Sequence, residues 1–314
     1  MEVDTASGDE YDAAIISCQS EGRWELTLAI LAEMRNGHLT PNAGSYDAAI
    51  RACGMGKQWQ QALKLIEAMH EDRMIPDASS FSAAIVACEQ SKQWQPALRL
   101  LATMQRGQMA PNVKHYNAVM GACEECHQWQ QAVELLAAMK KVQIAPDAIS
   151  YTAAVNACEK GRQWQQVIAV LAEMKQSGMK HNASNHKAAV SASEHGGQWQ
   201  YAISFLEAMQ NSGMAVNSNT YSSAINACAK GQQWQRVLDL YGAMKRAKKI
   251  PTASSYHAIF CACEHEHHGQ NALEILDEMR KSATIPTADH YTSAIRACEK
   301  SNLWQQALEL QKGI

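Results

Sequence analysis

Apolar and polar positions along the chain form a pattern that is clearest between residues 78 and 112. Its first part places apolar residues on one helical face, which predicts a helix over about residues 79–89: Ala84, Ile85 and Cys88. A polar corner follows at residues 90–93. Its second part carries one apolar stripe with the spacing of an amphipathic helix: Trp94, Ala97, Leu98, Leu101 and Met104. The segment is therefore predicted to form two helices joined by a short turn.

This two-helix pattern repeats along the whole chain with a step of 35 residues. Tryptophan marks the step at Trp24, Trp59, Trp94, Trp129, Trp164, Trp199, Trp234 and Trp304. The last gap is twice as long because Gly269 occupies the intervening site. A tyrosine series keeps the same step except at Phe81 and His186, and a proline series keeps it except at His181 and Val216. No insertion or deletion interrupts the nine units.

A single helix pair cannot bury both of its apolar stripes, so neighbouring pairs are expected to stack and share a continuous core. The predicted fold class is all-α: a superhelical α-solenoid of about nine helix-turn-helix repeats, whose hand the period does not fix. We expect a short acidic lead-in at residues 1–7, eight 35-residue repeats at 8–287 and a truncated ninth repeat at 288–314. Apolar side chains in its incomplete second helix are expected to be partly exposed, as in a fragment or at an oligomer contact. These side chains are Trp304, Leu308 and Leu310.

Composition and charge narrow the functional classes. Apolar residues make up 46% of the chain and charged residues 19%, which is typical of a folded protein and not of a disordered one. The net charge is −3, so any binding of nucleic acid must depend on local contacts and not on overall charge. No apolar run approaches the roughly 20 residues needed to cross a bilayer, so no membrane partner is expected. The acidic start does not resemble a signal or transit peptide.

Eight of the ten cysteines occupy the same position, or slot, in the first helix of their repeat: Cys18, Cys53, Cys88, Cys123, Cys158, Cys228, Cys263 and Cys298. Equivalent slots lie a full repeat apart, which exceeds the Cα separation of about 5.5 Å in a disulfide. We therefore expect reduced packing residues and an intracellular, reducing compartment.

The unit resembles the pentatricopeptide repeat (PPR) in its 35-residue P-type form. The resemblance lies in a helix pair that begins near Tyr and ends in Pro-Asp or Pro-Asn, as in YNAVMGACEECHQWQQAVELLAAMKKVQIAPD from Tyr116 to Asp147. It covers eight full units from about Gly8 to Thr287 and part of a ninth. The tetratricopeptide repeat has a different period and a different Trp-Leu-Gly-Tyr order, which excludes it.

This resemblance implies binding of single-stranded RNA with one base per repeat, read by the residue after the first-helix Tyr together with the last residue of the unit. The base-binding pairs implied are Ser82/Asn112, Asn117/Asp147, Thr152/Asn182 and Ser222/Thr252. Ser or Thr with Asn implies adenine and Asn with Asp implies uracil, so repeats three to five are expected to prefer 5′-AUA-3′. Other units place carboxylates near the strand or match no usual combination: Asp12/Asn42, Asp47/Asp77, Lys187/Asn217 and His257/Thr287.

The resemblance also implies two kinds of supporting contact. Ile149 stands at the position that sandwiches neighbouring bases, and other units have no aliphatic residue there. Phosphate-contacting lysines are implied at the end of the first helix: Lys160, Lys230 and Lys300. Cations at a helix end also favour the local dipole, so this second interpretation of the lysines stays open. We expect the eight tryptophans to pack between repeats and not to stack on bases.

The sequence carries only weak signals for catalysis or metal binding. A cluster of possible metal ligands consists of Cys261, Cys263, His265, His267 and His268. Cys263 belongs to the packing series and the histidines span a corner between helices, so we expect local repacking there, with no metal site and no cofactor. A phosphate loop, a GxSxG elbow and a deaminase signature are all missing from the sequence, so we assign no catalytic residue and predict that the protein is not an enzyme.

Three functions follow, in order of preference. The first is single-stranded RNA binding that serves RNA processing, stability, editing or translation in an organelle, a mitochondrion or chloroplast, on the strength of the resemblance alone. The second is a protein–protein scaffold of the same fold, which the net charge of −3 supports. The third is an enzyme that uses the Cys/His cluster, such as a metal-dependent nuclease. Salt-sensitive RNA binding would separate the first from the second, and sensitivity to chelators would reveal the third.

Overall fold

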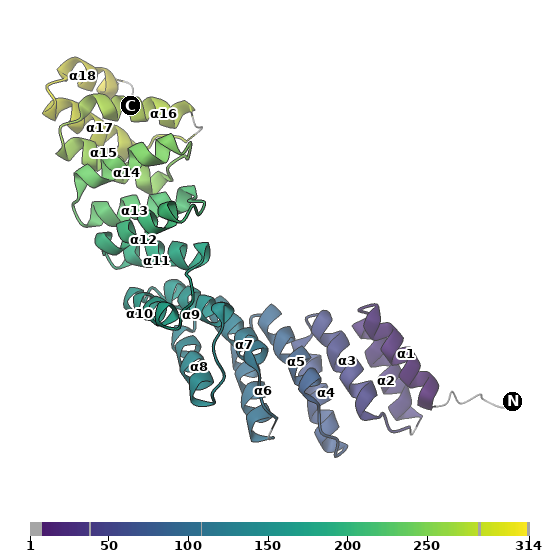
Figure 1. Cartoon of the computed structure of the whole chain (residues 1–314). Coiled ribbons are helices and arrows are strands. Elements are labelled where there is room, and N and C mark those ends of the chain that lie inside the picture. The colour runs from purple at the N-terminus through teal and green to yellow at the C-terminus, as the bar shows by residue number, and fades with distance from the viewer. Residues whose placement is uncertain (1–7, 38, 108, 282–283, 313–314) are drawn as a thin grey trace. The chain divides into compact units, whose positions relative to one another are not determined.

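The computed structural model describes residues 8–37, 39–107, 109–281 and 284–312. Within these ranges the chain forms 18 α-helices and no strand, which confirms the predicted all-α solenoid of about nine helix pairs (Figure 1). The helices fall into two compact units, Met1–Gly161 and Arg162–Ile314, and each unit is described by itself. None of the described helices is both long and apolar enough to span a membrane.

Each repeat contributes two helices of nearly constant length. The first helices are α1 (Gly8–Ser20), α3 (Ala43–Met55), α5 (Ala78–Gln90), α7 (Val113–Glu125), α9 (Ala148–Lys160), α11 (Ala183–His195), α13 (Ser218–Lys230), α15 (Ala253–His265) and α17 (Ala288–Lys300). The second helices are α2 (Trp24–Asn36), α4 (Trp59–Glu71), α6 (Trp94–Arg106), α8 (Trp129–Lys141), α10 (Trp164–Gln176), α12 (Trp199–Asn211), α14 (Trp234–Arg246), α16 (Gly269–Lys281) and α18 (Trp304–Lys312).

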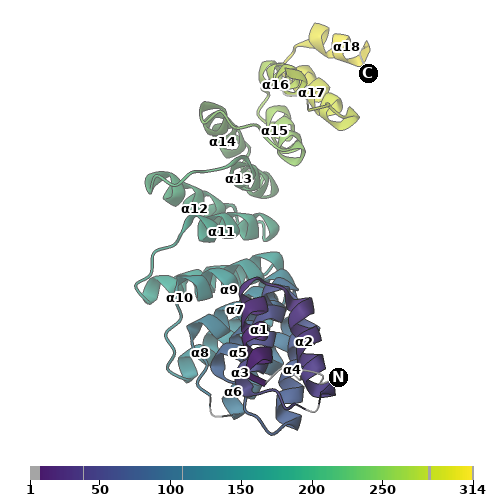
Figure 2. The ribbon, with the colours of Figure 1, turned by 90° about the vertical axis from the view of Figure 1, so that its right-hand side faces the viewer.

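The helices form two layers within each unit. In the first unit α1, α3, α5, α7 and α9 pack side by side, and in the second unit α11, α13, α15 and α17 do the same (Figures 1 and 2). Among the described residues, each second helix contacts only the first helices that flank it, as α4 contacts α3 and α5. The layer of first helices is therefore continuous within a unit, and equivalent residue positions recur along it at regular intervals. We call this row of equivalent positions the first-helix edge.

The corner between the two helices is closed by backbone hydrogen bonds. After α3, the Gln58 amide donates to the Cys53 carbonyl (2.8 Å) and the Lys57 amide donates to the Gly54 carbonyl (3.1 Å). This is the Schellman arrangement, which requires a left-handed residue, and Lys57 has φ 58°. The polar corner seen in the sequence is therefore a tight turn that reverses the chain within three residues.

The core is built from apolar residues of both helices, and the first helix contributes many small and aromatic ones. Ala84, Ile85 and Cys88 of α5 are all fully buried, as are the ring of Phe81 and the side chain of Met104 from α6. Burial raises the pKa of the Cys88 thiol to about 12, so this cysteine is an inert packing residue. The ten cysteines are all free thiols, as the sequence predicts.

The tryptophans pack against the next repeat at its helix corner. A Cβ atom added to Gly196 would overlap the ring of Trp164, and the same holds for Gly56 and Trp24. Their rings are half-buried, whereas Trp304 in the last helix is 58% exposed and Leu308 is 56% exposed. Packing between repeats is therefore the role of the tryptophan series, and the predicted exposure of these last two residues is confirmed.

We predict that Gly196→Ala destabilises the protein by about 1–3 kcal/mol, because the new methyl group collides with the Trp164 ring. Gly242→Ala in α14 is the matched control. Its Cβ would meet only the flexible end of Arg246 at 3.6 Å, so it should stabilise the helix by about 0.5–1 kcal/mol. Urea unfolding followed by circular dichroism measures both changes. Equal effects of the two substitutions would contradict the packing role assigned to Gly196.

Candidate nucleic-acid interface

The last residue of each repeat is the N-cap of the next first helix. Asn42, Asp77, Asn112, Asp147, Asn182 and Asn217 all accept a hydrogen bond from the backbone amide three residues further on. Thr252 and Thr287 hold the same place. An N-cap oxygen satisfies an amide that would otherwise lack a partner at the helix start. Helix formation therefore orients the same side chains that the resemblance assigns to base recognition.

The predicted pair of the fourth repeat is joined directly. The Asn117 side-chain amide on α7 donates to both carboxylate oxygens of Asp147, at 3.1 and 3.2 Å. Ser150 completes the group, because its backbone amide donates to Asp147 (2.9 Å) and its hydroxyl donates to the Asn117 carbonyl oxygen (2.6 Å). The structure thus brings together two side chains that lie 30 residues apart and holds both in one orientation.

The pair of the third repeat is joined through a histidine. The Asn112 backbone amide donates to Nδ1 of His115 (3.0 Å), while Nε2 of His115 lies 2.5 Å from the Ser82 hydroxyl. Burial lowers the pKa of His115, which keeps the imidazole neutral. Because Nδ1 accepts, the ring proton resides on Nε2 and is donated to Ser82. Ser82 and Asn112 therefore occupy one connected group without touching each other.

The other predicted pairs behave differently. Ser222 is buried, and its hydroxyl accepts from the Thr252 amide at 3.3 Å, so Thr252 is the more accessible member of that pair. Thr152 lies in the first unit, where its hydroxyl donates to the Ala148 carbonyl (2.7 Å). Asn182 lies in the second unit as the N-cap of α11. These two residues belong to separately described units.

Carboxylates dominate the first two repeats. The Asn42 amide donates to Asp12, and the Ser80 hydroxyl donates to Asp47. Burial raises the pKa of Asp47; the Ser80 hydrogen bond opposes this rise and the neighbouring Asp77 carboxylate adds to it. These repeats present negative charge at the slots where a base would be read.

A set of buried polar residues was missed by sequence reasoning. They occupy the third position of the first helix: Ser45, Ser80, His115, Ser150, Asn185, Thr220, Ser255 and His290. Ser150 shows their role, because it holds both members of the Asn117/Asp147 pair. The signal that could have found them is the capping-box spacing, in which the third helical residue bonds back to the N-cap.

Two features of the first-helix edge suit an unpaired base. Ile149 is 64% exposed at the start of α9, as a side chain that sandwiches a base must be. A cavity of about 340 Å³ lies beside Ser82, and its walls include Arg51, Met55 and Val86. Apolar walls with a few polar groups can hold a planar ring.

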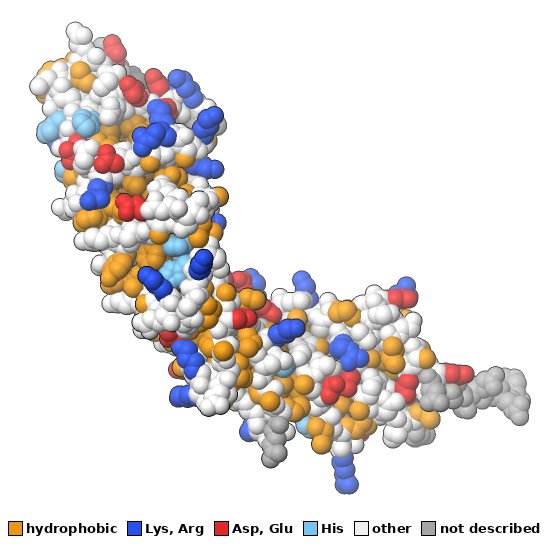
Figure 3. All heavy atoms as spheres, viewed as in Figure 1, with side chains coloured by type: hydrophobic (Ala, Val, Ile, Leu, Met, Phe, Trp, Pro, Cys, Tyr) orange, Lys and Arg blue, Asp and Glu red, His pale blue; other side chains and the backbone are white. Residues whose placement is uncertain are grey.

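The predicted phosphate-contacting lysines are tied to the preceding repeat. Lys160 Nζ lies 3.2 Å from Glu124 and 2.8 Å from Glu125, and Lys300 Nζ lies 3.0 Å from Glu264. Lys230 donates to the Glu194 carbonyl at 2.9 Å. Sequence reasoning missed these partners; Glu124, Glu194 and Glu264 each lie 36 residues before the lysine that they contact, and Glu125 lies 35 before Lys160. On the face drawn in Figure 3, other basic side chains gather over α14 and α16, while acidic and basic side chains are interspersed over the first unit.

The Cys/His cluster does not converge. Cys261 contacts His257 at 3.7 Å, Cys263 is buried in the core, and His265 stacks on the Trp234 ring at 4.5 Å. Within the described ranges, no three or more His, Cys, Asp or Glu side chains are placed to hold a metal ion. Local packing accounts for Cys263 and His265.

Models of the pentatricopeptide repeat family match most of the chain. The PPR repeat family matches residues 111–160, the PPR repeat 44–74 and 149–179, the pentatricopeptide repeat domain 64–126, and the pentatricopeptide repeat-containing protein model 191–314. Together these matches cover residues 44–179 and 191–314, which is well over half of the chain. The chain therefore belongs to the pentatricopeptide repeat family.

Solved structures share the fold at low sequence identity. Maize PPR10 matches with a TM-score of 0.52 and 18% identity over 97% of this chain and 49% of PPR10. A PPR10 variant in complex with an 18-nt PSAJ RNA element matches with a TM-score of 0.51 and 15% identity, covering 98% of this chain and 50% of that one. Arabidopsis thaliana nuclear proteinaceous RNase P 2 matches at 0.52 and 11% identity, over 58% of this chain and 41% of that one. The chain thus spans about half the length of PPR10. A comparison with curated proteins gave no match.

We predict that Asp147 makes the stability of the protein depend on pH. Partial burial would raise its pKa, but hydrogen bonds from Ser150 and Asn117 outweigh burial and lower it. A lowered carboxyl pKa stabilises the fold above its unfolded value of about 3.9 and ceases to do so as the pH falls through the folded pKa. The wild type should therefore lose stability relative to Asp147→Asn below about pH 4.

Thermal unfolding from pH 7 to pH 3 measures this difference. Asn also caps helices well, so Asp147→Asn should keep the fold at pH 7, whereas Asp147→Ala should cost about 1 kcal/mol. Parallel pH profiles for the wild type and Asp147→Asn would show that the Asp147 carboxylate makes no such contribution.

Proposed function

We propose that this protein binds single-stranded RNA along the edge formed by the first helices, with one base for each repeat. The observation that carries the proposal is the joined pair of Asn117 and Asp147, in which the two base-reading positions of the fourth repeat meet at hydrogen-bond distance. Polar residues recur at these two positions every 35 residues, which matches recognition of one base per repeat. PPR10, which has the same fold, was solved with an RNA element, and this supports the proposal.

The capping bonds bear on which base each repeat prefers. A capping Asn uses its oxygen for the helix and keeps an N–H donor, whereas a capping Asp keeps a second oxygen as an acceptor. Asn112 and Asp147 thus offer a donor and an acceptor in repeats three and four. Adenine accepts at N1 of its Watson–Crick edge and uracil donates at N3, so this order fits the first adenine and the uracil of 5′-AUA-3′. Ile149 would sandwich a base beside this group.

We place the function in RNA processing, stability, editing or translation, and the location in a mitochondrion or chloroplast. Both inferences rest on membership in the PPR family. The first-helix edge acts by holding a transcript segment, and protein partners would decide the outcome. Catalysis is no part of this proposal.

A protein–protein scaffold is the second candidate, and a specific observation favours it. Asp12, Asp47 and Asp77 put carboxylates at the slots of the first two repeats, and Lys160 and Lys300 are already paired with Glu. An acidic edge repels phosphate and attracts a basic partner. Binding to a basic peptide in the absence of any RNA binding would support this candidate.

We predict selective binding of a labelled single-stranded RNA that contains AUA, measured by fluorescence anisotropy. Replacing the central uracil with cytosine should weaken binding by about tenfold, because the Asp147 oxygen loses its donor. Asn117→Ser should reduce this discrimination, since Asn117 orients Asp147. UAU, double-stranded and DNA versions should bind more weakly than AUA.

Asn211→Ser at the end of α12 is the matched control and should leave both affinity and discrimination unchanged. If no strand binds at low salt, the RNA proposal fails and the scaffold takes its place. If binding does not depend on the central base, the one-base code is wrong for the fourth repeat.

We further predict that Glu124→Gln combined with Glu125→Gln strengthens RNA binding, because it frees Lys160 from its two ion pairs and Lys92 from its pair with Glu125. Each new phosphate contact should steepen the slope of log affinity against log salt by about 0.7. Glu67→Gln combined with Glu71→Gln on α4 removes the same charge elsewhere and serves as the control. An equal gain in both double variants would assign the effect to overall charge and not to Lys160.

A further inference from the structure

Several departures from the repeat meet at one place in the second unit. His186 stands where other repeats have Tyr or Phe, and His181 where they have Pro or Val. At the position of Phe205 the other repeats have an aliphatic residue, and at the position of Lys180 they have Thr, Ile or Ala. Random sequence changes would be scattered over the structure, whereas these four residues line a single cavity.

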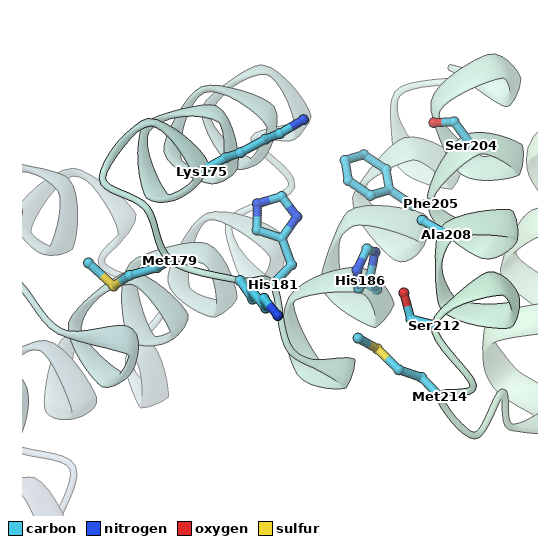
Figure 4. A pocket seen from close by; sticks show the side chains of 10 residues that line it. Lys175, Met179, His181, His186, Ser204, Phe205, Ala208, Ser212 and Met214 are labelled. Carbon is cyan, nitrogen blue, oxygen red and sulfur yellow. The ribbon is translucent and has the colours of Figure 1, made fainter.

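The cavity lies beside α10, α11 and α12 and has a volume of about 660 Å³. In Figure 4, Lys175, His181, His186 and Phe205 surround one open space, with Met214 on the other side of His186. The rings of His181 and Phe205 lie 5.5 and 5.8 Å from the His186 ring, both in edge-to-face arrangement. A volume of this size suits a small molecule.

A bond that recurs in other repeats is missing here. The tyrosine of this slot elsewhere bonds through its hydroxyl to the residue eleven positions before it, as Tyr116 does to Gln105 (2.8 Å) and Tyr221 to Gln210 (3.0 Å). The equivalent partner of His186 is Lys175, and the shorter imidazole makes no such bond. His186 is 6% exposed, and its Nδ1 is the one buried side-chain nitrogen or oxygen without a partner in the part of the chain that the structure describes. Internal hydrogen bonding therefore does not explain the exchange of Tyr for His.

The charges around the cavity are all positive. Lys175 and Lys180 are exposed, and neither ammonium group has a hydrogen-bond or ion-pair partner among the described residues. None of the ten lining residues is acidic. Two unpaired cations beside a partly apolar hollow attract an anionic group, while aromatic rings favour a flat ring as their neighbour.

We propose that this cavity binds a small molecule consisting of a planar aromatic ring system with an attached anionic group. The ring would pack among His181, His186 and Phe205, and the anion would pair with Lys175 and Lys180. A purine mononucleotide and a bicyclic aromatic carboxylate share this chemistry. The site is separate from the Asn117/Asp147 group, which lies in the first unit, and does not rest on RNA binding.

Isothermal titration calorimetry on the full chain tests the proposal with two anionic probes, adenosine 5′-monophosphate and 2-naphthoate. At least one of them should bind saturably, and the two arms identify whether the anion is a phosphate or a carboxylate. Adenosine and inorganic phosphate should each bind about tenfold more weakly or not at all, since each lacks one half of the ligand.

Three substitutions locate the site. His186→Tyr restores the residue of the other repeats and lets its hydroxyl reach Lys175, so it should keep the fold and abolish binding. Phe205→Leu should weaken binding about tenfold through loss of the ring contact, and Lys175→Gln should do the same through loss of charge. Lys140→Gln at the equivalent slot of the fourth repeat is the control and should leave binding unchanged.

Failure of both anionic probes to bind would overturn the proposal. So would binding that survives His186→Tyr, because the ligand would then lie elsewhere. Thermal unfolding of each variant shows whether a loss of binding reflects a loss of folding, and His186→Tyr is expected to unfold no earlier than the wild type.

Discussion

The fixed step of 35 residues between repeats is the constraint on which the rest of the structure depends. Each repeat packs on the next through the same slots, so Trp164 meets Gly196 just as Trp24 meets Gly56. One extra residue in a helix would turn the following apolar stripe by about 100° and separate these partners. Because the stacking is regular, a polar side chain at one slot of the first helix also returns at regular intervals along one edge.

Helix capping and the proposed recognition of bases use the same side chains. Asp147 satisfies an amide at the start of α9 and also accepts from Asn117. Asn and Asp cap helices about equally well, so exchange between them changes the outward atom from donor to acceptor at little cost in stability. This explains in physical terms how neighbouring repeats would differ in the proposed base specificity while keeping one backbone. Ser150 adds the rigidity, since it is buried and bonds to both members of the pair.

The sequence was sufficient for the fold but only partly for the site. The period and the apolar stripes predicted the helix pairs, the buried cysteines and the inter-repeat tryptophans. They could not show that Ser222 is buried, or that Lys160 is held by Glu124 and Glu125. These contacts join neighbouring repeats. The position of a residue within its repeat does not show which side chain of the adjacent repeat lies close enough to contact it. The capping role of Asp147 was readable from its place before a helix, whereas its bond to Asn117 required the packed structure.

Departures from the repeat fall into two physical kinds. In the eighth repeat Gly269 replaces Trp, and Ser301 of the ninth repeat occupies the space. A Cβ atom on Gly269 would collide with Ser301, whose hydroxyl accepts from the Gly269 amide at 2.7 Å. Around His186, by contrast, the neighbouring side chains leave a cavity open, and Nδ1 of His186 has no hydrogen-bond partner among the described residues. A buried polar atom without a partner costs free energy, so an arrangement that keeps one needs a reason outside the local packing. That contrast separates a repacked repeat from one that is shaped to receive a ligand.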